Sequence, residues 1–457
     1  MGMKRMESIE KLLDAASGFM WGWPLIVLLL GTHVYLTIRL RFIQRYLPQA
    51  IRLSLMRTSE GDGDISHFGA LTTALAATIG TGNIVGVATA IAAGGPGAVF
   101  WMWLTGVFGI ATKYSEALLA VKYRVTCANG QMAGGPMYVL ERGMNLKWLG
   151  VLFAFFTAIA AFGIGNMVQA NSIAELVRDT FHISPWITGA LMTLLTAVVI
   201  LGGIRSIARV CQALVPFMAI VYVAGCLVLL IMNASTLPQT VTLILTSAFT
   251  GQAALGGFLG ATMKEAIRYG AARGLFSNES GLGSAPIVAA AAQTNTPVRQ
   301  ALVSSSGTFW DTVVVCAMTG LVLVNSGEWQ SGVHDGAALT KAAFGDFGVL
   351  GGVVLTGGLL TFVFSTILGW SYYGEKAAEY LLGSRAIIPY RVLWVAFVMI
   401  GSVTTLRVVW SFADIANACM AIPNLISLIF LSGLIVAETR ASLWQSAEPG
   451  HSGVPRR

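Results

Sequence analysis

Two short stretches combine glycines with polar side chains inside otherwise apolar sequence. The first, TIGTGNIVG (78–86), spaces its three glycines as G-x-G-x-x-x-G. The second, GLFSNESGLGSAP (274–286), places Ser277, Asn278 and Glu279 between glycines. Glycine lets a ligand approach the main chain because no Cβ intervenes, and backbone N–H groups at the start of a helix bind anions. The chemistry that these stretches could do is recognition of a small charged molecule.

The composition decides against a nucleotide-binding loop. Of the 457 residues, 55% are hydrophobic and only 11% are charged, whereas soluble domains are about 25% charged. The chain is therefore predicted to be a membrane protein, and no strand is predicted before residue 78, as a dinucleotide fingerprint would need. The five cysteines form no C-x-x-C pair and no cluster with histidine, so neither a disulfide framework nor a zinc site is indicated.

Eleven apolar segments are long enough to cross a membrane, which takes about 20 residues. We therefore expect an all-α polytopic membrane protein. The predicted spans are 18–38, 66–93, 98–121, 149–177, 185–204, 211–232, 241–292, 300–325, 347–374, 386–406 and 410–437.

The positions of the basic residues predict the orientation. With the N-terminus outside, the inside-facing loops and tail hold 18 of the 28 Lys and Arg residues, and the outside-facing segments hold 6. The positive-inside rule then favours an N-out, C-in chain with an odd number of spans. The same bias explains the net charge of +7 without a nucleic-acid partner.

The two glycine-containing stretches fall in spans 2 and 7, five spans apart. In lipid, backbone that leaves the helix must be buried in protein or line a cavity. Paired interrupted helices point to the binding site of a secondary transporter, where half-helix N-termini suit a carboxylate and unwound carbonyls suit a cation such as Na⁺. Close helix packing through small residues accounts for scattered glycines such as Gly357 and Gly358 better than for two polar breaks.

The same residues carry a resemblance to a known family. GTGNIVGVATAIAAGGPGAVFWMW (80–103), GLFSNESGLGSAP (274–286) and FSTILGWSYYGEKAAEYL (364–381) resemble the alanine/glycine:cation symporter family. The resemblance implies a leucine-transporter-type fold, with one extra N-terminal helix before two inverted five-helix repeats. It also implies inward movement of alanine or glycine, sometimes the D-isomer, together with Na⁺.

The resemblance and the two breaks together predict the site residues. We expect the substrate to contact residues of the two breaks, of span 4 and of span 9: Thr81, Gly82, Asn83, Gln169, Phe276, Ser277, Asn278, Thr366 and Trp370. We expect Trp370 to cap the pocket and restrict it to small side chains. The Na⁺ site is predicted from hydroxyls of span 9 and carbonyls of the first break: Ile79, Gly82, Thr361, Ser365 and Thr366.

Several of these roles have a structural alternative. Gln169 could make a helix-to-helix amide hydrogen bond, Phe276 could be a packing aromatic, and the span 9 hydroxyls could bond to carbonyls of their own helix. Glu279 and Asp311 are acids at membrane depth, which points to function. Glu279 is expected in a gating or structural pair, and Asp311 is expected to pair with Lys113, Arg407 or a hydroxyl.

Lys113 and Glu116, three residues apart in span 3, are expected to form a local ion pair.

The predicted organisation is one transporter domain over residues 1–437. It comprises an amphipathic N-terminal segment (1–17), the extra span and its loop (18–65), a first repeat (66–232) and a second repeat (233–437), followed by a cytoplasmic tail (438–457). The expected location is a bacterial inner (plasma) membrane, with a monomer sufficient for function. No cofactor is expected other than Na⁺ as coupling ion.

The leading hypothesis is Na⁺-coupled symport of alanine or glycine. An alternative is H⁺ coupling, with Glu279 or Asp311 as the proton carrier. An intramembrane enzyme is disfavoured because the sequence has no G-x-S-x-G and no H-E-x-x-H. An ATP-driven pump lacks a P-loop, and two asymmetric broken helices favour alternating access over a channel.

Overall fold

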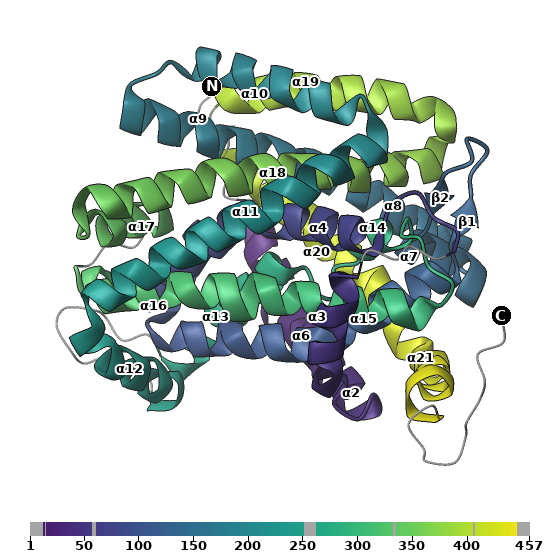
Figure 1. Ribbon diagram of the computed structural model, residues 1–457, viewed down its shortest axis with the longest axis horizontal. Coiled ribbons are helices and arrows are strands. Elements are labelled where there is room, and N and C mark those ends of the chain that lie inside the picture. The colour runs from purple at the N-terminus through teal and green to yellow at the C-terminus, as the bar shows by residue number, and fades with distance from the viewer. Residues whose placement is uncertain are drawn as a thin grey trace.

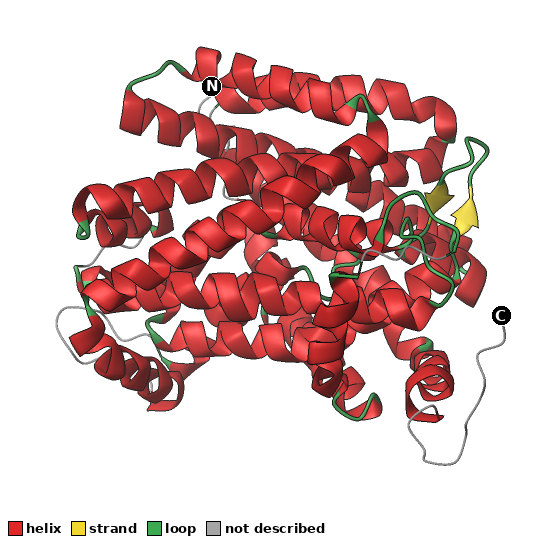
Figure 2. Cartoon of the chain, in the orientation of Figure 1, coloured by secondary structure: helices red, strands yellow, loops and turns green. Residues whose placement is uncertain are grey.

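Long helices lying roughly side by side make up nearly the whole molecule (Figure 1). The structure, a computed structural model, describes residues 12–13, 15–56, 61–250, 262–331, 335–404 and 407–445. Most of the predicted N-terminal segment 1–17 and part of the predicted tail 438–457 therefore lie outside the described residues. Among these described residues, strands contribute only one short hairpin, β1 (Val125–Thr126) and β2 (Met132–Ala133), shown in Figure 2.

The longer helices are α2 (Trp23–Arg39), α4 (His67–Thr78), α6 (Gly97–Lys122), α8 (Lys147–Ala160), α9 (Val168–Phe181), α10 (Pro185–Ile200), α11 (Gly203–Met232), α12 (Leu237–Thr250), α13 (Met263–Asn278), α15 (Pro297–Thr308), α18 (Gly348–Leu382), α19 (Ile387–Val403) and α20 (Arg407–Phe430). The shorter ones are α3 (Leu47–Ser54), α5 (Val87–Gly94), α7 (Pro136–Tyr138), α14 (Pro286–Ala289), α16 (Ala317–Ser326), α17 (Gly336–Gly345) and α21 (Ser432–Thr439).

Among the described residues, seven helices are long and apolar enough to cross a membrane, and a bent pair raises the number to eight. The prediction of an all-helical, multi-pass membrane protein is confirmed. The number eleven stays a prediction, because some of the expected spans are short or interrupted: α10 has 16 residues, and expected span 7 is divided among α12, α13 and α14.

Local sequence explains where the two interrupted helices begin. The hydroxyl of Ser66 caps α4 by accepting a hydrogen bond from the N–H of Gly69. Thr262 and Glu265 form a capping box at the start of α13, in which each side chain satisfies a free backbone N–H of the other.

Of the five π-helical segments in the described residues, three continue directly into an α-helix: η2 (Gly82–Gly86) into α5, η4 (Ala161–Met167) into α9 and η6 (Phe309–Cys316) into α16. The sequence analysis did not predict them. A π-helical turn inserts a residue into the regular ladder and is frequent at functional sites. Segment η2 contacts η6, and η4 packs against α18, so these irregular turns surround one region.

The two ends of the bundle differ. Helix α17 lies at one end of its long axis and the β1–β2 hairpin lies at the other (Figure 1). At the hairpin end, the segment before α4 pairs with the segment after α14: Asp64 N–H donates to the Ala291 carbonyl and Gln293 N–H donates to the Ile65 carbonyl, both at 2.8 Å.

Arg124, next to the hairpin, ties the same two segments together. Its guanidinium donates to four backbone carbonyls, those of Asp62, Ala290, Ala292 and Thr294, at 2.8–3.2 Å. We call this group of contacts the Arg124 clamp. It joins the entrance of the first broken helix to the exit of the second.

Candidate functional site

The first break separates α4 from α5. Helix α4 ends at Thr78, Ile79 is extended (φ −78°, ψ 96°), and the chain resumes through η2, so that the two halves are bent by 56°. The side chain of Asn83 holds this turn, because its Oδ1 accepts from the Gly80 N–H at 2.8 Å. The interruption predicted in span 2 is therefore present, with Asn83 bonded to the backbone of the break.

The second break follows α13. Glu279 ends that helix in the left-handed region (φ 56°), and Gly281 and Gly283 continue with φ of 89° and 87°, values that favour glycine. The Oγ of Ser284 donates to a carboxylate oxygen of Glu279. Ser284 and Glu279 thus bond to each other inside the bundle, where Glu279 is 3% exposed.

Glu116 supports the second break, a role that the sequence analysis missed. Its Oε1 accepts from the N–H groups of Gly281 (3.0 Å) and Gly283 (3.1 Å) and from Nδ2 of Asn424 (2.6 Å). The predicted local ion pair with Lys113 is wrong: the Nζ of Lys113 has no hydrogen-bond partner among the described residues. Glu116 instead accepts from the N–H groups of Gly281 and Gly283, which are distant in sequence and could not be predicted from the spacing of residues on its own helix.

Asp311 joins the two breaks. Its Oδ1 accepts from Nδ2 of Asn83 in the first break at 2.7 Å, and its Oδ2 accepts from Oγ of Ser277 in α13 at 3.0 Å. The thiol of Cys316 lies 3.3 Å from the same Asn83 nitrogen and 3.2 Å from the same serine oxygen. Of the partners left open for Asp311, the structure gives a hydroxyl, together with an amide; the side chain of Arg407 lies outside the described part.

Helix α18 brings two hydroxyls against the first broken helix. The Oγ1 of Thr366 donates to the Ile79 carbonyl at 3.2 Å, and the Oγ of Ser365 donates to the Ala76 carbonyl at 3.3 Å. Thr366 therefore meets Ile79, another residue predicted for the cation site. Both hydroxyls lie closer still to the Phe362 carbonyl of their own helix, at 2.8 Å for Ser365 and 3.0 Å for Thr366, which is the alternative that the sequence left open. The carbonyl of Ala76 was not predicted.

The other two predicted cation ligands have neighbours of their own. Thr361 donates to the carbonyl of Gly357 in its own helix at 2.7 Å, the alternative that the sequence left open. Gly82 faces α13, since a Cβ built on it would lie 3.4 Å from the Phe276 ring and 3.5 Å from the Ser277 backbone. The roles of Thr361 and of the Gly82 carbonyl in the cation site stay predictions.

Gln169 reaches the first break from the helix after η4. Its Nε2 donates to Thr81 Oγ1 at 3.3 Å and to the Ile164 carbonyl at 2.9 Å, while its Oε1 has no partner among the described residues. A Cβ on Gly80 would lie 2.5 Å from Thr366 Oγ1 and 3.6 Å from Gln169 Oε1. Gln169 and Thr366 therefore both lie next to Gly80, and the Gln169 Oε1 remains an acceptor without a partner among the described residues.

Trp370 is fully buried one turn beyond Thr366. It fits because η4 provides Gly165, where a Cβ would come within 2.2 Å of the Trp370 Cβ. It also makes an edge contact with Tyr373 and interacts with Glu279. This aromatic is thus held in place from three directions.

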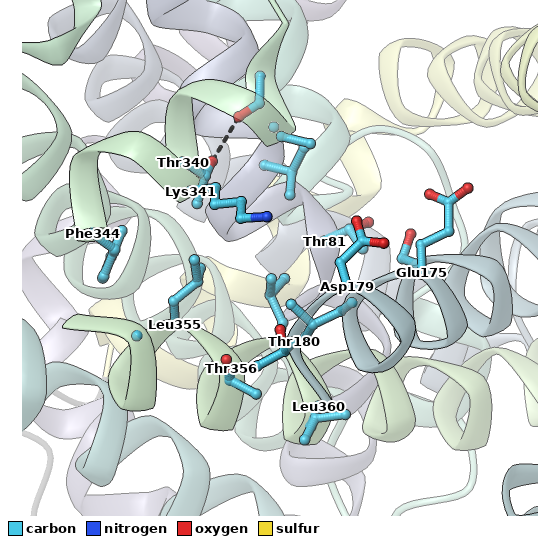
Figure 3. Close-up of a pocket in the computed structure, with 18 of the residues that line it drawn as sticks. Thr81, Glu175, Asp179, Thr180, Thr340, Lys341, Phe344, Leu355, Thr356 and Leu360 are labelled. Atoms are coloured by element: carbon cyan, nitrogen blue, oxygen red, sulfur yellow. Dashed lines mark hydrogen bonds between the residues drawn. The ribbon is translucent and has the colours of Figure 1, made fainter. Parts of the chain in front are cut away.

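A cavity of about 1060 Å³ leads from the surface to the first break (Figure 3). Thr81, Gly82 and Phe276 line it together with charged residues nearer its mouth: Glu175, Asp179, Arg273, Asp335 and Lys341. In Figure 3, Asp179, Glu175 and Thr81 lie on one wall and Lys341 and Phe344 on the facing side. The cavity opens at the α17 end, away from the Arg124 clamp. Arg273, which lies 5.8 Å from the centre of the Phe276 ring, was not predicted as part of the site.

Comparison with known proteins agrees with this arrangement. A model of the sodium:alanine symporter family matches residues 6–452. A transporter of Haemophilus influenzae is 54% identical over 95% of this chain and 96% of its own. The sodium/alanine symporter AgcS of Methanococcus maripaludis is 53% identical over 94% of this chain and 96% of its own.

Among solved structures, MhsT in complex with L-phenylalanine superposes with a TM-score of 0.56 at 16% identity, over 83% of this chain and 89% of that one. At this identity the likeness concerns the fold alone, and it supports a transporter fold.

Proposed function

Because the chain belongs to the sodium:alanine symporter family, we propose that it is a secondary transporter that carries alanine or glycine across the plasma membrane together with Na⁺. The observation that carries the proposal is the contact of the α18 hydroxyl pair with the first interrupted helix, close to a cavity whose lining includes Thr81 and Gly82 after that helix and Phe276 of the second. Free half-helix ends and unwound carbonyls bind a zwitterion and a cation in this class of transporter.

The Na⁺ ion is assigned to the carbonyls of Ala76 and Ile79 and the hydroxyls of Ser365 and Thr366. Each hydroxyl can donate its proton to the Phe362 carbonyl of its own helix, at 2.8 Å for Ser365 and 3.0 Å for Thr366. Its oxygen lone pairs then remain for a cation. A shell made only of neutral oxygens suits a hard cation. Thr361 is not included in this assignment because its hydroxyl donates to the Gly357 carbonyl of its own helix.

The amino acid is assigned to the cavity floor formed by Thr81, Gly82 and Phe276, with Gln169 beside it. Its carboxylate would bind the backbone N–H groups at the start of the second half-helix, where the helix dipole favours negative charge. Its ammonium would bind the Oε1 of Gln169, an acceptor without a partner among the described residues. Trp370, packed against Gly165, leaves little room for a long side chain.

The finer architecture is part of the proposal. Residues 66–232 and 233–437 would form two inverted five-helix repeats after one extra helix, with eleven spans and the N-terminus outside. The cavity mouth carries Asp179 and Lys341, in segments that the charge distribution places outside, whereas Arg124 belongs to a segment that it places inside. The structure would then represent a state open to the outside and closed inside.

Uptake of radiolabelled alanine into proteoliposomes tests this function. An inward Na⁺ gradient should drive accumulation, whereas matched K⁺ gradients should not. The alternative, H⁺ coupling, is motivated by the buried carboxylates of Glu279 and Asp311. Uptake that follows an inward proton gradient and ignores Na⁺ would replace the proposal with that alternative.

A further inference from the structure

A buried lysine without a hydrogen-bond partner lies beside both breaks. Lys113, in the middle of α6, is 4% exposed, and its Nζ donates to no atom of the described residues. A buried charge is costly unless it is paired or hydrogen-bonded. Retaining an ammonium here therefore requires compensation from its surroundings.

The space around Lys113 is bounded by the ends of both interrupted helices. A cavity of about 10 Å³ is lined by Lys113, by Thr78 and Asn278, by Pro286, and by Ser304 of α15. This volume holds about one water molecule. Thr78 is the last residue of α4 and Asn278 is the last residue of α13, so two helix C-termini face the same small space.

Helix C-termini carry a partial negative charge. In transporters with interrupted helices, such ends attract the coupling cation. Here the chain itself delivers a cation to the point where the two ends meet, since the ammonium of Lys113 lines the space between Thr78 and Asn278.

Carboxylates in the surroundings also favour a positive charge at this position. Lys113 interacts electrostatically with Glu116 of its own helix, with Glu279 between α13 and α14, and with Asp311 of η6. A fourth titratable neighbour, His33 of α2, also interacts with it. Two helix ends thus face the ammonium, and three carboxylates attract it from a greater distance. Together they favour more positive charge than Lys113 alone supplies.

We propose that the ammonium of Lys113 is a built-in cation of the transport site. It occupies the meeting point of the two half-helix C-termini and thereby lowers by one the number of external cations that move with each substrate. The inference rests on the proposed Na⁺-coupled function and deepens it, because it assigns a determinant of ion stoichiometry to a residue outside the Na⁺ shell.

The experiment measures ²²Na⁺ and [³H]alanine uptake in parallel in proteoliposomes with wild-type protein, Lys113→Gln and the charge-keeping Lys113→Arg. The ratio of Na⁺ to alanine should rise by one in Lys113→Gln, because a second ion replaces the ammonium, and should stay at the wild-type value in Lys113→Arg. A Lys113→Gln variant that transports alanine at the wild-type ratio overturns the inference. Wild-type protein that takes up no alanine with Na⁺ overturns the proposed function instead.

A stability measurement covers the case in which Lys113→Gln does not transport. Its thermal unfolding is followed in detergent with NaCl and with choline chloride at equal ionic strength. Na⁺ should raise the unfolding temperature of Lys113→Gln more than that of wild type, since a ligand that binds the folded state stabilises it. Equal effects on the two proteins, or a variant that high Na⁺ does not stabilise, contradict the inference.

Discussion

Thr366 connects α18 to the first break through a single side chain. Its Oγ1 reaches the Ile79 carbonyl and the Phe362 carbonyl of its own helix, so it fixes the spacing of the oxygens proposed to hold Na⁺. In the same way, the Oγ of Ser365 reaches the Ala76 carbonyl. Two neighbouring hydroxyls on one helix therefore set the geometry of a site whose other oxygens come from backbone.

Replacing Thr366 by valine removes the hydroxyl and keeps the shape. We expect the Na⁺ concentration for half-maximal alanine uptake to rise at least about tenfold, which corresponds to roughly 1.4 kcal/mol. Thr366→Ser should restore most of the affinity. Ser371→Ala is the matched control, because Ser371 donates only to the Leu368 carbonyl of the same helix. An unchanged Na⁺ requirement in Thr366→Val would remove this residue from the cation site.

Asp311 is the carboxylate that holds the two breaks at a fixed separation. In Asp311→Asn, hydrogen bonds to a charged group, worth about 1.5–3 kcal/mol each, become weaker neutral ones. The maximal rate of alanine uptake should fall more than tenfold, while Glu141→Gln, at a half-exposed pair with Lys147, should transport normally. Retained Na⁺-driven uptake with a lost pH dependence would instead identify Asp311 as a proton carrier.

At the level of whole helices, glycine decides how closely α18 approaches the first broken helix. A Cβ on Gly369 would lie 2.6 Å from the backbone nitrogen of Ala77, and backbone cannot move aside as a flexible side chain can. Gly31 of α2, in contrast, has open space where its Cβ would be. The close contact places the α18 hydroxyls within reach of the Ala76 and Ile79 carbonyls.

Gly369→Ala should therefore destabilise the protein by about 1–3 kcal/mol, the usual cost of overpacking a core, and should weaken Na⁺ binding by moving the hydroxyls outward. Gly31→Ala should leave both unchanged or slightly improve stability, because alanine favours helix. Thermal unfolding in detergent and Na⁺ titration of uptake check the pair. Equal behaviour of the two variants would mean that α18 and α4 can separate without effect.

A second prediction at the level of helices and their connecting segments concerns the Arg124 clamp. Arg124→Gln removes most of the donors that reach the carbonyls of Asp62, Ala290, Ala292 and Thr294, so amides in segments 61–65 and 290–294 should exchange hydrogen faster. Lys122→Gln is the control, since its partner Glu438 lies on the half-exposed surface. Hydrogen exchange read by mass spectrometry measures both. No acceleration in Arg124→Gln would show that the backbone pairing alone closes this end.

Both interruptions were predictable from the sequence, because glycines clustered with polar residues within an apolar run favour a backbone that leaves the helix. In lipid, such a backbone is tolerated only where it is buried in protein or lines a cavity. The contact of Thr366 with Ile79 was also predicted through the family resemblance. The surroundings of Glu116 and Lys113 were not predicted. Because they are three residues apart on one helix, they were expected to pair with each other. The Glu116 carboxylate instead accepts hydrogen bonds from the N–H groups of Gly281 and Gly283. The π-helical turns have no residue signature of their own, and they set which way Asn83 and Asp311 point.

For the molecule as a whole, the open cavity and the Arg124 clamp lie at opposite ends (Figure 1), so orientation in the membrane decides what the structure represents. Lys341 lies in α17 at the cavity mouth, and Lys147 begins α8 near the hairpin end. The charge distribution places Lys341 outside and Lys147 inside. A membrane-impermeant maleimide should therefore label Lys341→Cys on intact cells, and Lys147→Cys only after permeabilisation. Wild-type protein, whose cysteines are buried or half-buried, gives the background labelling.

If the structure is the outward-open state, alanine with Na⁺ should reduce labelling of Thr89→Cys inside the cavity. Alanine with choline should not reduce it, because closure over the substrate needs both ligands. The reverse pattern at Lys341 and Lys147 would invert the topology and make the same cavity the inward-open route of release.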